Sequence, residues 1–175
     1  MARLRLATCW LDGCSGCHMS LLDLDQDLIA LLRRVDLVYG PLVDAQEFPE
    51  NVDVTLVEGA VSSQDDLKLA RTVRARSRLV VALGDCAVTS NVPGMRNGLA
   101  ARRLLESVYV EGADHQRAVP SAGVPPLLRQ AVPLHDVIAV DLHLPGCPPR
   151  PGLLRQVLGD LVEGRRPTVT RARFG

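Results

Sequence analysis

The chain has 175 residues, of which 47% are hydrophobic, and its 20 basic side chains are balanced by 20 acidic ones. This length and composition are typical of one globular domain and exclude a disordered chain. The formal net charge of zero gives no reason to expect a nucleic acid as partner. We find neither a secretory signal nor an apolar stretch long enough to span a bilayer, so we expect a cytoplasmic protein without a membrane span.

In chain order, short segments rich in leucine or β-branched residues alternate with segments of helical periodicity. The expected strands are Leu4–Cys9, Val35–Tyr39, Val52–Val57, Leu79–Leu83 and Val137–Leu142. The expected helices are one capped by Ser20 and running to Leu32, then Gln64–Ala75, Gly98–Ser107 and Leu153–Val162. Near-continuous apolar strands that alternate with helices predict an α/β fold with a doubly wound, mostly parallel sheet.

Two segments do not fit this alternation. The proline-rich segment Glu111–Pro133 predicts a long irregular connection with one short helix around Leu127–Gln130. Residues 164–175 are rich in arginine and lack an apolar stripe, which is typical of a flexible or partner-docking tail. We therefore expect one domain over residues 1–163, followed by a tail over residues 164–175.

Five cysteines in a cytoplasmic chain indicate metal or redox chemistry rather than disulfides. Cys14 and Cys17 form a C-x2-C pair, while Cys86 and Cys147 stand alone and far along the chain. Each of these loops follows a predicted strand. Because parallel strands end at one edge of a sheet, we expect the four thiols to converge at the carboxyl edge.

Four thiolates suit either an iron-sulfur cluster or a tetrahedral zinc ion. Structural zinc sites usually combine two C-x2-C pairs, so the two isolated cysteines favour the cluster. Glycine or proline flanks every one of the cysteine loops, and glycine lets the backbone approach a bulky cofactor. The flanking residues are Gly13, Gly16, Gly84, Pro145, Gly146, Pro148 and Pro149.

Four motifs resemble the small subunit of nickel-iron hydrogenases, in the same order and at similar separations. They are Trp10–Cys17 (WLDGCSGC), Val57–Val61 (VEGAV), Gly84–Thr89 (GDCAVT) and Leu144–Pro149 (LPGCPP). Within that family the chain is most similar to the short small subunit of cytoplasmic bidirectional NAD-reducing hydrogenases. This resemblance implies a flavodoxin-like domain.

The resemblance also implies a function and its partners. Cys14, Cys17, Cys86 and Cys147 would ligate one [4Fe-4S] cluster, the one closest to the nickel-iron site of a large subunit. The chain would relay electrons from there to a diaphorase module that carries flavin, NAD and further iron-sulfur clusters. No catalytic residue is expected in this chain. An FMN is suggested only by the flavodoxin-like sheet, and a fold does not establish a site.

Three further residues lie near the cysteine loops and are candidates for tuning a cluster. Glu58 ends a predicted strand at the cysteine edge, where it either approaches the cluster or caps a loop. His18 could donate to a cluster sulfur or simply begin a helix. Cys9 is either a buried small side chain or a redox-sensing thiol.

Two alternatives remain open from the sequence. The iron-sulfur subunit of the complex I quinone module shares the fold, but its first motif carries adjacent cysteines, whereas Ser15 and Gly16 separate Cys14 from Cys17 here. A zinc-stapled interaction module without a redox role would use the same four thiolates.

Overall fold

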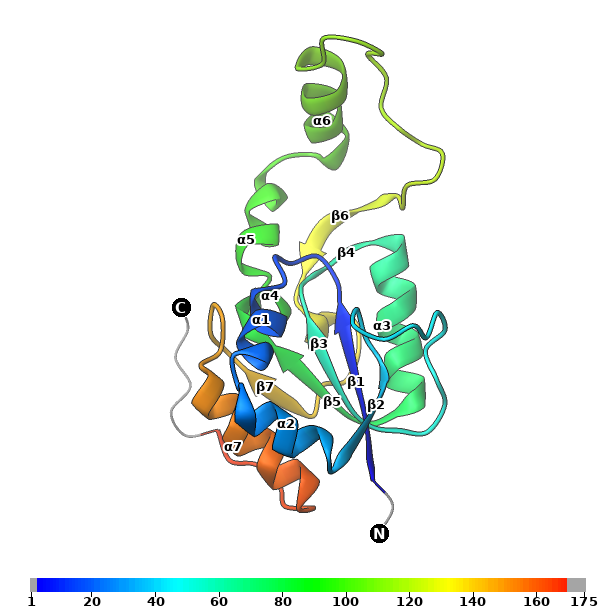
Figure 1. Ribbon diagram of the computed structural model, residues 1–175. Coiled ribbons are helices and arrows are strands. Elements are labelled where there is room, and N and C mark those ends of the chain that lie inside the picture. The colour runs from blue at the N-terminus through cyan, green and yellow to red at the C-terminus, as the bar shows by residue number, and fades with distance from the viewer. Residues whose placement is uncertain (1–2, 170–175) are drawn as a thin grey trace.

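The computed structural model describes residues 3–169, and the fold is built on a five-stranded parallel sheet (Figure 1). The strand order is β2-β1-β3-β5-β7, which is the flavodoxin-like order 2-1-3-4-5 when only these strands are counted. The strands are β1 (Leu4–Trp10), β2 (Val35–Tyr39), β3 (Val52–Glu58), β5 (Ser77–Leu83) and β7 (Leu142–Leu144). The predicted doubly wound α/β fold is confirmed.

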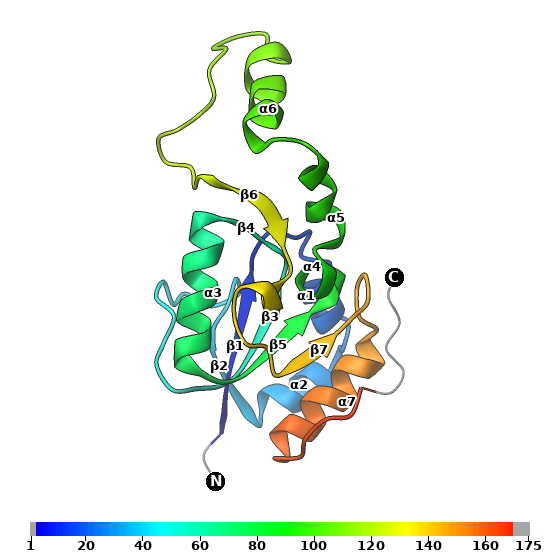
Figure 2. The same ribbon diagram turned by 180° about the vertical axis from the view of Figure 1, so that it is seen from behind.

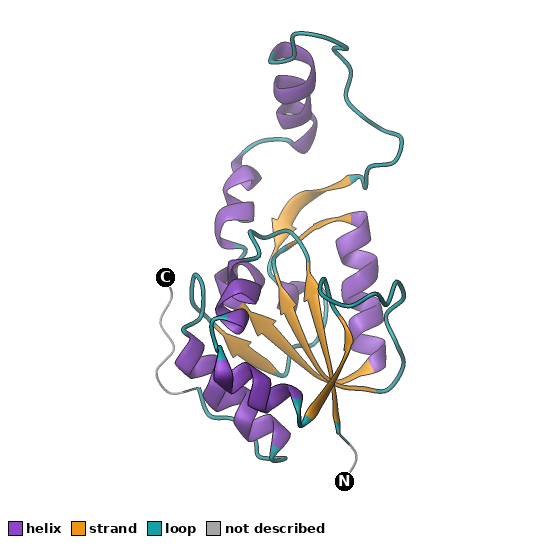
Figure 3. Cartoon of the chain, in the orientation of Figure 1, coloured by secondary structure: helices purple, strands orange, loops and turns teal. Residues whose placement is uncertain are grey.

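Helices cover both faces of this sheet (Figure 3). Alternate residues of β1 show the two layers: Leu6 packs in a cluster with leucines of α1, α2 and α7, whereas Ala7 packs in another with Ala70 and Val73 of α3. The helices are α1 (Gly16–Leu22), α2 (Gln26–Leu32), α3 (Gln64–Arg76), α4 (Gly84–Thr89) and α7 (Pro151–Val162). None of the helices in the described part of the chain is long and apolar enough to cross a membrane.

A second, small sheet lies beyond the carboxyl edge of the first one. Strand β4 (Val61–Ser63) pairs antiparallel with β6 (Leu127–Val132). Between β5 and β6 the chain makes α4 and then projects away from the body before it returns (Figures 1 and 2). We call residues 91–126 the arm; it holds α5 (Asn91–Gly94), the 3-10 turn η1 (Met95–Gly98), α6 (Ala101–Glu106) and the π-helical turn η2 (Ser107–Glu111).

The helix expected from Ser20 to Leu32 is wrong, because the structure breaks it into α1 and α2 at residues 23–25. Asp25 has a φ of 49°, which a continuous right-handed helix cannot contain. Ser20 does not cap a helix either; its hydroxyl donates a hydrogen bond to the carbonyl of Pro149. The leucine periodicity runs through the break because both short helices face the same hydrophobic cluster.

Three other expected elements also differ from the structure. The strand expected at Val137–Leu142 instead begins at Leu142, because Val137, Ile138 and Val140 leave the sheet and pack against the cluster under α3. The helix expected around Leu127–Gln130 is strand β6, since this segment finds a pairing partner in β4. The helix expected at Gly98–Ser107 begins three residues later, as α6, and the π-helical turn η2 follows it directly.

The segment after α7 was expected to be a flexible or docking tail. Its described part, residues 164–169, is irregular, yet Pro167 is buried and Val169 packs against the α7 side of the core. Arg171 and Arg173 lie outside the described residues. The domain boundary at residue 163 therefore stays a prediction.

Candidate metal centre

The four cysteines of the expected site lie at the carboxyl edge of the sheet. Cys14 is in the loop after β1, Cys17 is in the first turn of α1, Cys86 is in α4, and Cys147 is in the loop after β7. Cys17 is buried, Cys86 is half-buried, and Cys14 and Cys147 are exposed. Together they form a thiol set that reaches from the core to the surface.

Burial and nearby charge raise the pKa values of two of the four thiols. Burial is the main cause that raises the pKa of the Cys17 thiol, and negative charge on Glu58 and on the other three cysteines raises it further. The pKa of Cys86 is raised by burial as well, and by charge on Cys147 and Cys14. Thiolates gathered in this way repel one another unless a cation or a positively charged iron centre is bound among them.

Glycine at position 84 leaves room for a sulfur. Gly84 has a φ of +81°, and a Cβ atom there would lie 2.2 Å from the Sγ of Cys17. At Gly16 a Cβ atom would lie 3.2 Å from the Sγ of Cys14. The positive φ and the missing side chain therefore let the backbone before Cys86 pass directly over Cys17.

Two hydrogen bonds fasten the Cys86 loop to the Cys147 loop. The backbone N–H of Asp85 donates to the carbonyl of Gly146 at 2.9 Å, and the N–H of Gly146 donates to Oδ1 of Asp85 at 2.6 Å. Gly146 has a φ of +136°, and the Cys147–Pro148 peptide is cis. Asp85 was not among the expected site residues; its position between Gly84 and Cys86 was the only signal in the sequence.

Glu58 caps the Cys14–Cys17 loop from the end of β3. Its carboxylate accepts the backbone N–H of His18 at 3.0 Å and that of Cys17 at 3.4 Å, and it also contacts Nδ1 of His18. Glu58 and His18 are both buried, and Nε2 of His18 has no hydrogen-bond partner within the described residues. The expectation that Glu58 caps a loop is thus met, whereas a bond from His18 to a cluster sulfur stays a prediction.

Cys9 lies apart from the other four thiols. It is buried among apolar side chains of the face under α3, and burial raises the pKa of its thiol to about 12. A thiol in such surroundings stays protonated and behaves as a small apolar side chain. The redox-sensing role considered for Cys9 therefore stays a prediction without structural support.

The donor set fits an iron-sulfur cluster. In residues 3–169, no group of three or more His, Cys, Asp or Glu side chains is arranged to hold a single metal ion. In a [4Fe-4S] cluster each thiolate binds a different iron, so the sulfurs need not converge on one point. Four soft thiolates at one edge of the sheet, with the backbone at Gly84 free of a side chain beside Cys17, match that requirement.

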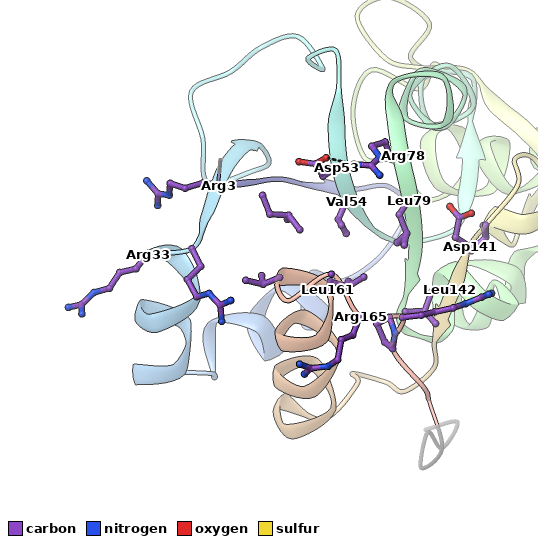
Figure 4. A pocket seen from close by; sticks show the side chains of 17 residues that line it. Arg3, Arg33, Asp53, Val54, Arg78, Leu79, Asp141, Leu142, Leu161 and Arg165 are labelled. Carbon is purple, nitrogen blue, oxygen red and sulfur yellow. Dashed lines mark hydrogen bonds and ion pairs between the residues drawn. The ribbon is translucent and has the colours of Figure 1, made fainter. Parts of the chain in front are cut away.

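A hollow lined by arginines lies at the opposite, amino edge of the sheet (Figure 4). It has a volume of about 1240 Å³, and apolar residues such as Val54, Leu79 and Leu161 also line it. Most of its arginines already pair with carboxylates, so we assign it no ligand. The pairs are Arg3–Asp36, Arg34–Glu163, Arg78–Asp53 and Arg165–Asp160.

Comparison with known proteins identifies relatives of the chain. A family profile described as "NADH ubiquinone oxidoreductase, 20 Kd subunit" matches residues 14–161. The chain is 36% identical over 171 residues to the NAD-reducing hydrogenase HoxS subunit delta of Cupriavidus necator, covering 93% of this chain and 80% of that protein. The chain belongs to the small-subunit family of nickel-iron hydrogenases. The family membership expected from the four motifs is confirmed.

Two further matches extend the comparison. A chain in the crystal structure of an NAD+-reducing [NiFe]-hydrogenase in the H2-reduced state superposes with a TM-score of 0.94 at 36% identity, over 99% of this chain and all of that one. The chain is also 39% identical, over 89% of its length, to one subunit of the F420-non-reducing hydrogenase of Methanocaldococcus jannaschii. It spans only 54% of that relative's length.

Proposed function

We propose that the chain is the electron-transfer small subunit of a cytoplasmic NAD-reducing nickel-iron hydrogenase, with one [4Fe-4S] cluster held by Cys14, Cys17, Cys86 and Cys147. The cluster, when bound, would supply one-electron transfer between the nickel-iron site of a large subunit and a diaphorase that carries flavin and NAD. The observation that carries the proposal is the placement of four thiols at one edge of the sheet, where Gly84 keeps the backbone beside Cys17 free of a side chain.

The chain's own residues have defined tasks in this proposal. Cys17 anchors the buried side of the site, and Cys14 and Cys147 form its exposed side, which faces a partner subunit. Asp85 holds two of the loops together through Gly146. Glu58 fixes the backbone of the first loop, so that the thiols are preorganised before the metal binds.

Metal analysis tests the proposal directly. Purified without oxygen together with its large subunit, the wild-type chain should be brown and contain about four iron atoms per chain. Replacing any one of the four cysteines with alanine should lower the iron content and abolish electron transfer from hydrogen to NAD. The matched control is Cys9→Ala, which should keep the iron because Cys9 lies in the other core cluster.

The alternatives have distinct outcomes in the same experiment. A colourless chain that contains one zinc and no iron would support the zinc-stapled module and sink the proposal. Association with quinone-reducing subunits in place of a hydrogenase large subunit would support the complex I alternative. Flavin extracted from the heterodimer of small and large subunits would add FMN to the cofactors; the flavodoxin-like sheet alone does not justify including it.

A further inference from the structure

The arm is the part of the described chain that has no core of its own. Residues 91–126 contain no buried residue, although they include two helices and two further helical turns. Helices of four to six residues are not stable in water without tertiary packing. The arm therefore depends on contacts at its base or with another protein.

The base of the arm is fastened to the small β4–β6 sheet. Arg96 donates hydrogen bonds to the carbonyls of Ser62 and Leu128, and Asn97 both donates to and accepts from the backbone of Ala131. These bonds fix the direction in which α5 and α6 leave the body (Figure 2).

Around this base and farther along, the arm presents apolar side chains to solvent. Met95 is 79% exposed, and Val92, three residues earlier in the same run of helical turns, is 61% exposed. Four more large apolar side chains are exposed farther along: Leu99, Val108, Tyr109 and Val124. The charged side chains of α6 are paired within the arm, in the ion pairs Arg102–Glu106 and Arg103–Glu111. An apolar surface of this kind marks an interaction site.

The arm continues the cysteine edge. It begins at Asn91, five residues after Cys86, so its root lies beside the proposed cluster site. Trp10 and Met19, which flank the first cysteine pair in the sequence, are also about half exposed. The exposed apolar residues thus extend from the loops of Cys14 and Cys17 along the chain that follows Cys86.

We infer that the arm is a docking element for the large subunit, a role that rests on the proposed function and adds a surface to it. The subunit that holds the nickel-iron site must cover the cysteine edge, because electron transfer weakens steeply with distance. A protein seated on that edge also meets the arm at its root. Permanent complexes bury more apolar surface than transient ones, which matches the arm's exposed side chains.

Single carboxylate substitutions on the arm test this role. Met95→Asp and Leu99→Asp should weaken the heterodimer with the large subunit at least tenfold, as measured by sedimentation or biolayer interferometry without oxygen. A carboxylate in an apolar interface loses its hydration without gaining a partner. The matched controls are Ile29→Asp on α2 and Leu42→Asp in the loop after β2, which are similarly exposed but outside the arm and should leave the affinity unchanged.

Iron content separates this inference from the proposed function. The arm variants should retain wild-type iron per chain, because none of the substituted residues touches the thiols. Iron-poor wild-type protein would defeat the proposed function, whereas iron-loaded arm variants with unaltered heterodimer affinity would overturn the docking role alone. Arm variants that still bind the large subunit but no longer bind the diaphorase would overturn the docking role, because they would assign the arm to the diaphorase. Arm variants that lose only self-association would overturn it in the same way.

Hydrogen exchange provides a measurement without any substitution. Amides of residues 91–111 should exchange rapidly in the free chain and at least tenfold more slowly in the heterodimer. The carboxyl-terminal half of α3, residues 70–76, packs in the core and ends at the amino edge of the sheet, so it should exchange equally in both forms. Unchanged exchange in the arm on assembly would contradict the inference.

Discussion

Asp85 and Gly146 form a pair of hydrogen bonds that joins the loop of Cys86 to the loop of Cys147. The N–H of Gly146 lies 2.6 Å from Oδ1 of Asp85, and the N–H of Asp85 lies 2.9 Å from the carbonyl of Gly146. The two residues are far apart in sequence, so the pair sets the relative position of two expected ligands. The pair is also buried, so a polar group left there without a partner would lower the free energy of unfolding.

Asp85→Ala should separate these two loops. Removing the carboxylate leaves the N–H of Gly146 buried without an acceptor, which costs about 1–3 kcal/mol of unfolding free energy. We expect lower denaturant stability and faster loss of iron to a chelator. Asp85→Asn keeps an oxygen that can accept the bond and should behave much more like the wild type. Equal chelator resistance in the alanine and asparagine variants would argue against this role.

Gly84→Ala should impair the site even though the substitution adds only one methyl group. The new Cβ atom would lie 2.2 Å from Sγ of Cys17, and the φ of +81° disfavours any L-residue. We expect a loss of at least about 1 kcal/mol in stability and a clear fall in bound iron. The control is Gly159→Ala in α7, where a Cβ atom meets nothing within 4 Å. That helical substitution should be neutral or stabilising by up to about 1 kcal/mol.

Glu58→Ala should loosen the Cys14–Cys17 loop. The N–H groups of Cys17 and His18 would lose their acceptor in a buried place, so stability should fall by about 2 kcal/mol. Glu58→Gln retains one oxygen acceptor and should recover part of that loss. Iron content and urea unfolding of both variants measure the effect; a glutamine variant as damaged as the alanine variant would show that the charge, not the hydrogen bonding, matters.

Cys9 predicts a dependence of stability on alkaline pH. Burial raises the pKa of its thiol to about 12, whereas an unfolded thiol titrates near 8.5. Between these values the folded chain holds a proton that the unfolded chain has lost, so the free energy of unfolding should fall as the pH rises. Cys9→Ala should remove the contribution of Cys9 to the slope of the unfolding free energy against pH. Tyr39→Phe is a useful companion, because burial and the charge of Cys9 also raise the pKa of Tyr39.

The same shift predicts low reactivity. In the folded, metal-free chain at pH 8, Cys9 should resist iodoacetamide, while the exposed Cys14 and Cys147 should react. Mass spectrometry of the peptides identifies each modified thiol. Rapid labelling of Cys9 under native conditions would contradict its place in the core.

The sequence could predict those parts of the structure that depend on local patterns. Val35–Tyr39 matches its strand, and Gln64–Ala75 falls one residue short of its helix, because apolar periodicity and the Ser63 cap act locally. The gathering of the cysteines followed from one rule about parallel strands. The break at Asp25 was not predictable, because the leucines that face the core continue their spacing across it.

Other features depend on contacts between distant segments. Strand β6 exists because β4 is there to pair with it, and no periodicity in Leu127–Gln130 indicates that partner. Asp85 looked like an ordinary turn residue, and its bond to Gly146 follows only from the packing of β5 beside β7. The polar contacts around the cysteines were therefore harder to predict than the cysteines themselves.

The parallel sheet also determines when the cysteine site can form during synthesis. Cys14 follows the first strand, whereas Cys147 follows β7, a three-residue edge strand that pairs only with β5 within the described residues. The thiol set is thus incomplete until the chain through Cys147 has left the ribosome and β7 has docked. If all four thiols hold one cluster, its insertion has to follow the assembly of the five-stranded sheet.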